Sequence, residues 1–512
     1  MLAQKVAVIL LLFLAICLQG AWPVPDVNES HYVAKMIAFW NRDWVENDPF
    51  LESANAHPFF YLVFGWPSRY LEPEVFTWVG RVIGWLLLAC GWYALAEPLL
   101  TSPSKILFSG ILFVCLQERF NMAGEWVVGG LEAKVPAYGF AFFGLGAFLR
   151  GKWNFAWVLL GLATAFHVLA GGWAWLAAGI SLAASRPNWT EFKKMLPGLG
   201  VGGALALIGL IPAVTLNLHV DRATLLRAYE IYLFRLGHHL SLFRLPTGAF
   251  ERFFLLSFVW FLLEWNSVGS HSHRRFRMIV GASLAFATIG AILSLFEWIS
   301  PPLAAALLRY YWFRLADVMI PAGVAVAAMR WDQEKPSSQA GISNVYRAIL
   351  LAAVFLHLGS YLYIRVRQQI PRADENRVEN YAAWRDACRW VAESGQVPKG
   401  SRFLTPRLSQ TFRWYARRAD VVNWKDIPQD ARSIVWWWHA LCEVHAYRDP
   451  AGQLRWLPNL AQAGTNRIVS LARRYQAQYV LVPSWPPLEL PIVYQNSTYT
   501  IYQVPETSPP KP

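Results

Sequence analysis

Charged residues are scarce in this chain. Only 15% of the 512 residues are Asp, Glu, Lys or Arg, whereas about 25% is usual in a soluble protein. Hydrophobic residues make up 55% and aromatic residues 15% of the chain. This composition excludes a disordered chain and a coiled coil, and it argues against a purely soluble enzyme.

Cysteine is also scarce, with five residues in the whole chain. This excludes a small disulfide-rich scaffold, and the lack of any Cys-x-x-Cys spacing argues against a zinc ribbon. Cys388 and Cys442 both lie in the C-terminal part. A disulfide between them stays open if that part lies outside the cytoplasm.

Nucleotide-binding signatures are missing as well. The one Gly-Gly pair in a polar loop, Gly129-Gly130, has neither Walker nor Rossmann spacing. The net charge of +13 does not predict a nucleic-acid partner, because much of it lies in short joints between apolar blocks.

Long apolar blocks dominate the first 365 residues and predict a mostly α, polytopic transmembrane bundle. We expect about eleven spans, several of them shorter than about 20 residues, which suits tilted or broken helices that line a cavity. The blocks lie near 6–18, 76–97, 106–118, 134–149, 153–168, 172–185, 198–216, 250–266, 278–296, 315–329 and 346–364.

The joints between these blocks alternate in charge. Alternate joints are basic and short, and the positive-inside rule places them in the cytoplasm. The other joints, 22–75, 118–133, 217–249 and 297–314, are longer and contain acids. We therefore expect an inner (plasma) membrane protein of a bacterium with a cytoplasmic N-terminus and an uncleaved first span. The basic residues are Lys105, Arg150, Lys152, Arg186, Lys193, Lys194, Arg274, Arg275, Arg277, Arg330, Lys335 and Arg347.

The C-terminal part reads as a small soluble α/β domain. We expect residues 1–364 to form the membrane domain and 365–505 an extracytoplasmic domain, with 506–512 as a disordered tail. Helical patterns at 376–393, 433–444 and 466–478 alternate there with short strand-like runs, of which Tyr479–Val482 is the most apolar.

The first outside loop, 22–75, carries the strongest candidates for catalysis. Asp26 and Glu29 follow the first span directly, and such carboxylates can act as a general base or as metal ligands. His31, Asp48 and His57 are further candidates in the same loop. Ordinary solvated surface acids are the alternative, and the use of a divalent metal stays open.

Other outside joints carry residues suited to bind phosphate. Glu132 and Lys134 stand at the head of an apolar helix, where a charge must be paired or face water. Glu132 is a catalytic candidate, and an interfacial ion pair is the alternative. Because adjacent histidines on a helix diverge by about 100°, we favour phosphate or hydroxyl contacts over a metal. The candidate donor-phosphate ligands are Lys134, Arg235, His238, His239 and Arg314.

All these acids and cations fall on one predicted side of the membrane. Without a cytoplasmic nucleotide loop, a lipid-linked donor fits this arrangement better than a nucleotide-linked one.

The pattern resembles the GT-C superfamily of integral-membrane glycosyltransferases. The likeness rests on the many spans, on the acidic start Asp26…Glu29-Ser30-His31-Tyr32 of a long first outside loop, and on the outside C-terminal domain. It implies transfer of a sugar from a polyprenyl-phosphate donor, with Asp26 or Glu29 as base or metal ligand. The family's Asp-x-Asp is missing, so Glu118 or Glu132 would have to serve.

A narrower resemblance links the chain to bacterial polytopic proteins without an established activity, which share the stretch Gly129 to Lys134 and the pair His238-His239. Two other functions stay open. One is a lipid or glycan transporter or flippase. The other is a non-catalytic membrane protein whose C-terminal domain, with 20 Lys and Arg against 12 Asp and Glu from residue 365, binds acidic glycans or partners.

Overall fold

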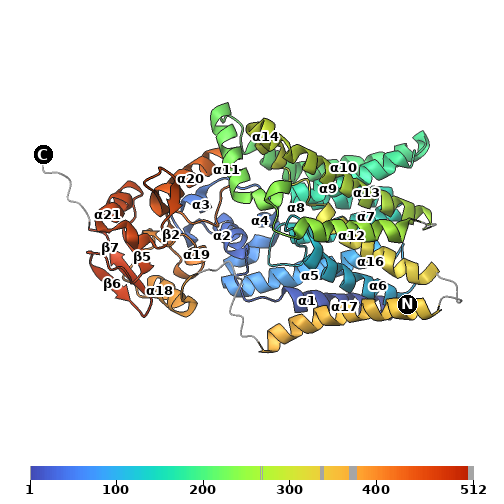
Figure 1. Cartoon of the computed structure of the whole chain (residues 1–512), viewed down its shortest axis with the longest axis horizontal. Helices are drawn as coiled ribbons and strands as arrows, with labels where there is room; N and C mark the ends of the chain where they lie inside the picture. The colour runs from blue at the N-terminus through green and yellow to red at the C-terminus, as the bar shows by residue number, and fades with distance from the viewer. Residues whose placement is uncertain (1, 266, 268, 335–339, 368–377, 506–512) are drawn as a thin grey trace.

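The computed structural model describes residues 2–265, 267, 269–334, 340–367 and 378–505. Figure 1 shows an elongated molecule with a helical bundle at one end and a C-terminal α/β region at the other. The mostly helical architecture and the small C-terminal α/β region expected from the sequence are confirmed. The proposed tail 506–512 lies outside the described residues.

Each apolar block forms a helix of the bundle. The chain runs back and forth between the two ends of the bundle, so sequential helices pack as neighbours, as α8 does against α7, α9 and α10. These helices are α1 (Leu2–Gly20), α5 (Pro73–Ala96), α6 (Pro103–Phe120), α7 (Lys134–Leu149), α8 (Trp153–Phe166), α9 (Val168–Ala184), α10 (Trp189–Thr215), α12 (Ala249–Glu264), α13 (His271–Ser294), α16 (Ala316–Glu334) and α17 (Ala340–Arg367).

The expected count of about eleven spans is not confirmed. Within the described chain, five helical stretches are long and apolar enough to cross a membrane: Leu2–Gly20, Pro73–Ala96, Trp189–Thr215, His271–Ile299 and Asn344–Arg367. Helix length explains part of the difference. The 16 residues of α7 cover only about 24 Å, whereas a hydrocarbon core is about 30 Å thick.

Further helices, most of them short, form within the predicted outside loops. In Figure 1 the helices α2, α3, α4 and α11 lie between the bundle and the C-terminal α/β region. They are α2 (Glu29–Trp40), η1 (Arg42–Trp44), α3 (Pro49–Glu52), α4 (Pro58–Gly65), η2 (Trp66–Arg69), α11 (Arg222–Leu240), η3 (Leu242–Arg244), α14 (Phe296–Ile299) and α15 (Pro301–Leu308).

The C-terminal α/β region is built on a five-stranded mixed sheet of order β2-β1-β5-β7-β6. Strand β1 pairs in parallel with β2 and β5, whereas β7 runs antiparallel to β5 and β6. The separate hairpin of β3 and β4 was not expected. The elements are α18 (Tyr381–Glu393), β1 (Arg402–Leu404), α19 (Phe412–Ala416), β2 (Ala419–Asp420), α20 (Ala431–His445), β3 (Ala446–Arg448), β4 (Leu454–Trp456), η5 (Leu460–Ala463), α21 (Thr465–Arg474), β5 (Tyr479–Pro483), β6 (Ile492–Gln495) and β7 (Tyr499–Gln503).

Apolar packing ties α11 to the C-terminal α/β region. Ala228 and Ile231 of α11 are buried in the same hydrophobic cluster as Trp437 and Leu441 of α20. Burial of such side chains contributes roughly 1.5–3 kcal/mol each for the larger ones. The disulfide left open by the sequence does not form, because Cys388 and Cys442 are both free.

Candidate functional site

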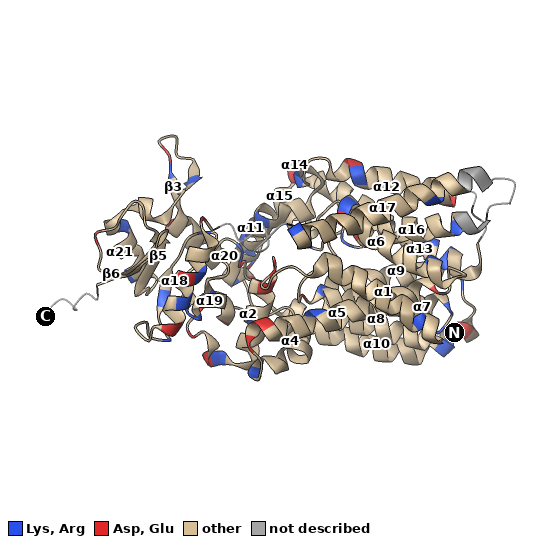
Figure 2. Cartoon of the chain, turned by 90° about the horizontal axis from the view of Figure 1, so that it is seen from below, with Lys and Arg blue, Asp and Glu red and all other residues tan. Residues whose placement is uncertain are grey.

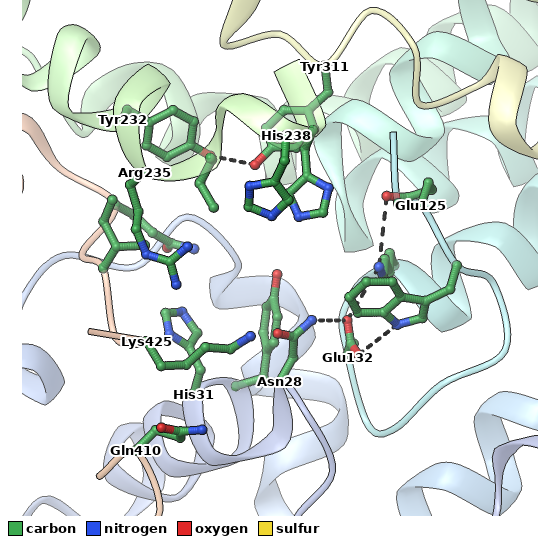
Figure 3. A pocket seen from close by; sticks show the side chains of 18 of the residues that line it. Asn28, His31, Glu125, Glu132, Tyr232, Arg235, His238, Tyr311, Gln410 and Lys425 are labelled. Carbon is green, nitrogen blue, oxygen red and sulfur yellow. Dashed lines mark hydrogen bonds and ion pairs between the residues drawn. The ribbon is translucent and has the colours of Figure 1, made fainter. Parts of the chain in front are cut away.

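A cavity of about 510 Å³ lies where the bundle, α11 and the C-terminal α/β region meet. Six separate segments wall it, and Figure 3 shows polar side chains converging on one space. The segments are the start of α2, the loop 124–134, His167 between α8 and α9, the end of α11, the loop before α16, and residues 408–429 of the C-terminal α/β region.

Seven of the candidates named from the sequence line this cavity, although they come from four separate joints between apolar blocks. They are His31, Glu132, Lys134, Arg235, His238, His239 and Arg314.

Two buried glutamates and two buried cations form the most polar wall. Glu125 Oε2 lies 3.1 Å from Arg314 Nε and 3.8 Å from Lys134 Nζ, and Glu132 Oε2 lies 3.6 Å from Lys134 Nζ. The Tyr138 hydroxyl donates a 3.0 Å hydrogen bond to Glu125. This pairing explains how four charged side chains that are each less than 10% exposed can be tolerated here.

Both oxygens of Glu132 already accept hydrogen bonds. Asn28 Nδ2 donates to Oε2 over 3.1 Å, and Trp126 Nε1 donates to Oε1 over 3.2 Å. The Trp126 ring also carries the Lys134 ammonium 3.6 Å from its centroid. Glu132 is therefore held as a counter-ion of Lys134, with both of its oxygens already engaged.

The loop 122–125 is fixed by a carboxylate at the start of α16. Asp317 accepts hydrogen bonds from the backbone N–H groups of Met122 and Ala123, at 2.7 and 2.8 Å, and of Glu125 at 3.3 Å. This aims the Ala123 carbonyl at the end of α11, where its oxygen lies 2.5 Å from His239 Nδ1.

That contact sets the tautomer of His239. Burial lowers the pKa of His239 to about 3, so the imidazole is neutral at physiological pH. Because a carbonyl oxygen only accepts hydrogen bonds, Nδ1 carries the ring hydrogen and Nε2 carries the lone pair. The ring of His238 lies 4.0 Å away, centroid to centroid, and Figure 3 shows it directed into the cavity.

The C-terminal α/β region closes the cavity from the other side with Gln410, Trp424 and Lys425. The guanidinium of Arg235 lies 4.6 Å from the centre of the Trp424 ring, and its Nε donates to the Trp424 carbonyl over 3.2 Å. His31 Nδ1 lies 3.4 Å from Asp426 Oδ1 of the same region. Residues almost 400 positions apart therefore share one site.

Glu29 does not line the cavity, contrary to the role that the resemblance implied. Its two oxygens accept hydrogen bonds from Arg81 Nε, at 2.6 Å, and Nη2, at 2.5 Å, and from the N–H groups of Asp26 and Leu131, at 2.7 Å each. The carboxylate is completely buried, so this geometry leaves it neither a free lone pair for a substrate nor an approach path.

Three more candidates lie outside the cavity. Asp26 accepts from its neighbour Val27 N–H, and burial raises its pKa to about 7. Asp48 caps α3 and binds Arg413 of α19. His57 stacks on His167, with 4.9 Å between ring centroids, and lines an adjoining cavity.

The adjoining cavity, of about 520 Å³, is lined mainly by apolar side chains at the ends of α9 and α10 and along α11. Arg314 lines both cavities, as do Tyr232 and Tyr311, whose hydroxyls are 3.0 Å apart. A polar cavity, called the polar chamber below, and an apolar cavity, called the apolar chamber, thus adjoin along a shared set of side chains. The residues common to both are Tyr32, His167, Tyr232, Tyr311, Arg314 and Gln429.

Several cavity residues were missed from the sequence. Glu125 and Tyr311 could have been found, since each stands within a few residues of a named candidate in an outside joint. Gln410 and Lys425 carry no comparable signal, because only the fold brings 408–429 to the bundle. In the described part of the chain, no group of three or more His, Cys, Asp or Glu side chains is arranged to hold a metal ion.

Comparisons with known proteins give three findings. Residues 382–444, within the C-terminal α/β region, match DUF6798, a domain of unknown function. No curated protein matches the chain. Among solved structures, the Archaeoglobus fulgidus oligosaccharyltransferase in complex with Zn and sulfate is similar over 93% of this chain and 67% of that chain, at 13% identity and a TM-score of 0.42. Because identity and structural similarity are both low, we infer the function from the cavity and not from this neighbour.

Proposed function

We propose that this protein is an integral-membrane glycosyltransferase of GT-C type, which moves a sugar from a polyprenyl-phosphate-linked donor to an acceptor at the extracytoplasmic membrane face. The observation that carries the proposal is the pair of adjoining chambers, one polar and one apolar, which share Arg314 and three tyrosines. A lipid-linked sugar phosphate has the same division into an anionic head and an apolar chain.

Charge supports an anionic head in the polar chamber. Lys134, Arg235, Arg314 and Lys425 line it against only two carboxylates, and the imidazole of His239 in its wall is neutral. Arginine and lysine are the side chains best suited to bind phosphate. In our proposal these cations hold the donor phosphate and stabilise it as it leaves.

His239 is the proton acceptor in this proposal. Its Nε2 lone pair accepts a hydrogen bond from the acceptor hydroxyl and takes the proton as the new bond to the anomeric carbon forms, when the attacking oxygen has become strongly acidic. The bond between the anomeric carbon and the phosphate oxygen breaks, and polyprenyl phosphate leaves. Glu125 and Glu132 keep the cations in place, and Asp317 positions His239 through the loop 122–125.

The orientation is also part of the proposal. Figure 2 shows ribbon segments of Lys and Arg residues at the end of the bundle where the N-terminus lies, away from the C-terminal α/β region. The positive-inside rule then supports a cytoplasmic N-terminus and an extracytoplasmic domain 365–505. Reporter fusions after Arg150 and at the C-terminus check this, and the two should report opposite sides of the membrane.

The proposed activity is tested by comparing polyprenyl-linked sugars and surface glycans, by mass spectrometry, between the parent strain, a deletion strain and complemented strains. Wild-type protein should restore the glycan and remove the lipid-linked sugar that accumulates on deletion. Lys134→Gln and Arg314→Gln should fail to do so at normal membrane abundance. Arg227→Gln, a change at an exposed i,i+3 ion pair of α11, is the matched control and should restore both.

Unchanged lipid-linked sugars on deletion, or full restoration by both cavity variants, would contradict the proposal. Movement of a lipid-linked sugar across sealed vesicles without any new covalent product would instead support the transporter alternative.

A further inference from the structure

A groove of about 1000 Å³ lies on the C-terminal α/β region, between the second half of α20, α21 and the hairpin of β3 and β4. Among the described residues, none lines both this groove and either of the two chambers above. Its chemistry is therefore separate from that of the proposed transferase site.

Four arginines line the groove, against the single carboxylate of Glu443. Three of them are held by backbone carbonyls. Arg467 Nη2 donates to the carbonyls of Glu443 and Ala446, at 2.7 and 2.6 Å. Arg448 Nη1 donates to the Gly452 carbonyl at 2.8 Å, and Arg402 donates to the carbonyls of Tyr475 and Asn47.

This arrangement favours anions for two reasons. A carbonyl is neutral, so it fixes a guanidinium without cancelling its charge. A fixed guanidinium loses less conformational entropy when it binds a carboxylate or a sulfate. Glu443 is already engaged by the Tyr475 hydroxyl at 2.5 Å and by Arg474 Nη1 at 2.7 Å, so it opposes a ligand little.

Exposed aromatic side chains accompany these cations. Trp436 is 40% and Tyr447 43% exposed, although both line the groove. Aromatic faces of this kind pack against the C–H faces of sugar rings, and Ser470 and His439 supply hydrogen-bonding groups between the arginines. The volume exceeds what one phosphate or sulfate ion would need and suits several sugar units.

We infer that this groove binds an anionic saccharide chain, bearing carboxylate or sulfate groups, in addition to the substrates of the cavity. The inference rests on the proposed function in one respect only. The extracytoplasmic orientation proposed above is the reason for choosing a saccharide over a nucleic acid as the ligand. The groove itself requires no transferase activity.

Calorimetry on the full chain in phosphatidylcholine nanodiscs tests this inference. The probes are polygalacturonate and dextran sulfate oligomers, a neutral maltooligosaccharide of equal length, and oligothymidylate. The two anionic saccharides should bind, with affinity that falls as salt rises, and the neutral one should not. The double change Arg448→Gln with Arg474→Gln should weaken binding at least tenfold.

Two further variants separate the features of the groove. Arg389→Gln removes one positive charge from α18, outside the groove, and should change affinity less than twofold. Trp436→Ala should weaken saccharide binding but leave any binding of inorganic sulfate unchanged. Absence of binding by both anionic saccharides, equal loss in the Arg389 control, or tighter binding of oligothymidylate would overturn the inference. Because no sugar transfer is measured, these outcomes are independent of those that test the proposed function.

Discussion

His239 and Glu29 show how two buried ionisable side chains near one loop differ in what they can do. His239 lines the cavity, and its Nδ1 is hydrogen-bonded to a backbone carbonyl. The lone pair therefore lies on the other ring nitrogen, Nε2. Glu29 has all its acceptor capacity used by Arg81 and by backbone N–H groups. Only the first arrangement leaves a group that can take a proton from a substrate.

We predict that His239→Gln lowers the rate of transfer about 10²-fold or more, the usual contribution of a general base. The wild-type rate should stay level from pH 7.5 to 5.5, because a pKa of about 3 keeps His239 unprotonated over that range. Initial rates across this range, with the exposed His219→Gln as control, check both statements. A wild-type rate that falls with a midpoint near 6.5 would contradict the assigned state of His239.

Glu29→Gln should destabilise the protein rather than remove activity selectively. Breaking a buried ion pair by removing one partner costs about 3–5 kcal/mol, so a lower melting temperature and lower membrane abundance are expected. Glu46→Gln, an exposed change in the same loop, should leave both unchanged. Glu29→Gln protein with wild-type melting temperature and no activity would return Glu29 to the catalytic role.

Two of the candidates that line the cavity, Lys134 and Arg314, stand beside the end of an apolar helix. A charge at such a place needs a partner or water, and both were available only in the cavity. Asp26 and Glu29 do not line the cavity. Their closeness to a span predicts a position at the membrane surface, but it does not predict the direction of the side chain. Arg81, which binds Glu29, lies in the first part of an apolar block, and its position in the sequence does not indicate that pairing.

At the scale of elements, glycine sets how closely the bundle helices approach. A Cβ at Gly161 of α8 would overlap the carbonyl of Gly202 in α10, whereas one at Gly203 would meet open space. Contacts between small residues are a common way to pack membrane helices.

We therefore predict that Gly161→Ala lowers stability by about 1–3 kcal/mol through overpacking, while Gly203→Ala changes it little. Thermal unfolding in detergent measures the difference between the two variants. Equal melting temperatures for both would show that α8 and α10 do not touch as described.

Apolar periodicity located every helix of the bundle, because a run of apolar residues between polar joints has few other structures to adopt in a membrane. It could not give the number of spans, which depends on helix length and tilt. The pattern also missed α2 and α11, whose residues face the C-terminal α/β region as well as the bundle and so lack one clear apolar face.

At the scale of the whole molecule, a buried charge cluster joins the first outside loop to the C-terminal α/β region. Arg413 forms ion pairs with Asp48 of the loop and with Asp420 and Asp426 of its own region. One cation among three carboxylates favours retention of a proton, and burial raises the pKa of Asp420 to about 7.

This cluster predicts a pH-dependent stability. The folded protein keeps a proton on Asp420 that the unfolded chain has lost, so its stabilising effect is full at low pH and is lost as pH rises through about 7. Between pH 5 and 7, wild-type protein should lose about 1 kcal/mol per pH unit relative to Asp420→Asn, which mimics the protonated form, and the loss should level off above pH 7. Melting temperatures at pH 5, 6, 7 and 8 check this, with the exposed Asp43→Asn as control. If wild-type protein instead gained stability relative to Asp420→Asn as pH rises, the proposed protonation of Asp420 would be wrong.

The central claim is that residues from the bundle, α11 and the C-terminal α/β region together hold the phosphate of a lipid-linked sugar. The most direct measurement is an electron cryo-microscopy structure of the protein in nanodiscs, prepared with the lipid-linked sugar that accumulates in the deletion strain. We predict density for a phosphate within hydrogen-bond distance of Lys134 or Arg314, with the lipid chain in the adjoining apolar chamber. A lipid bound elsewhere, with both chambers empty, would contradict the account.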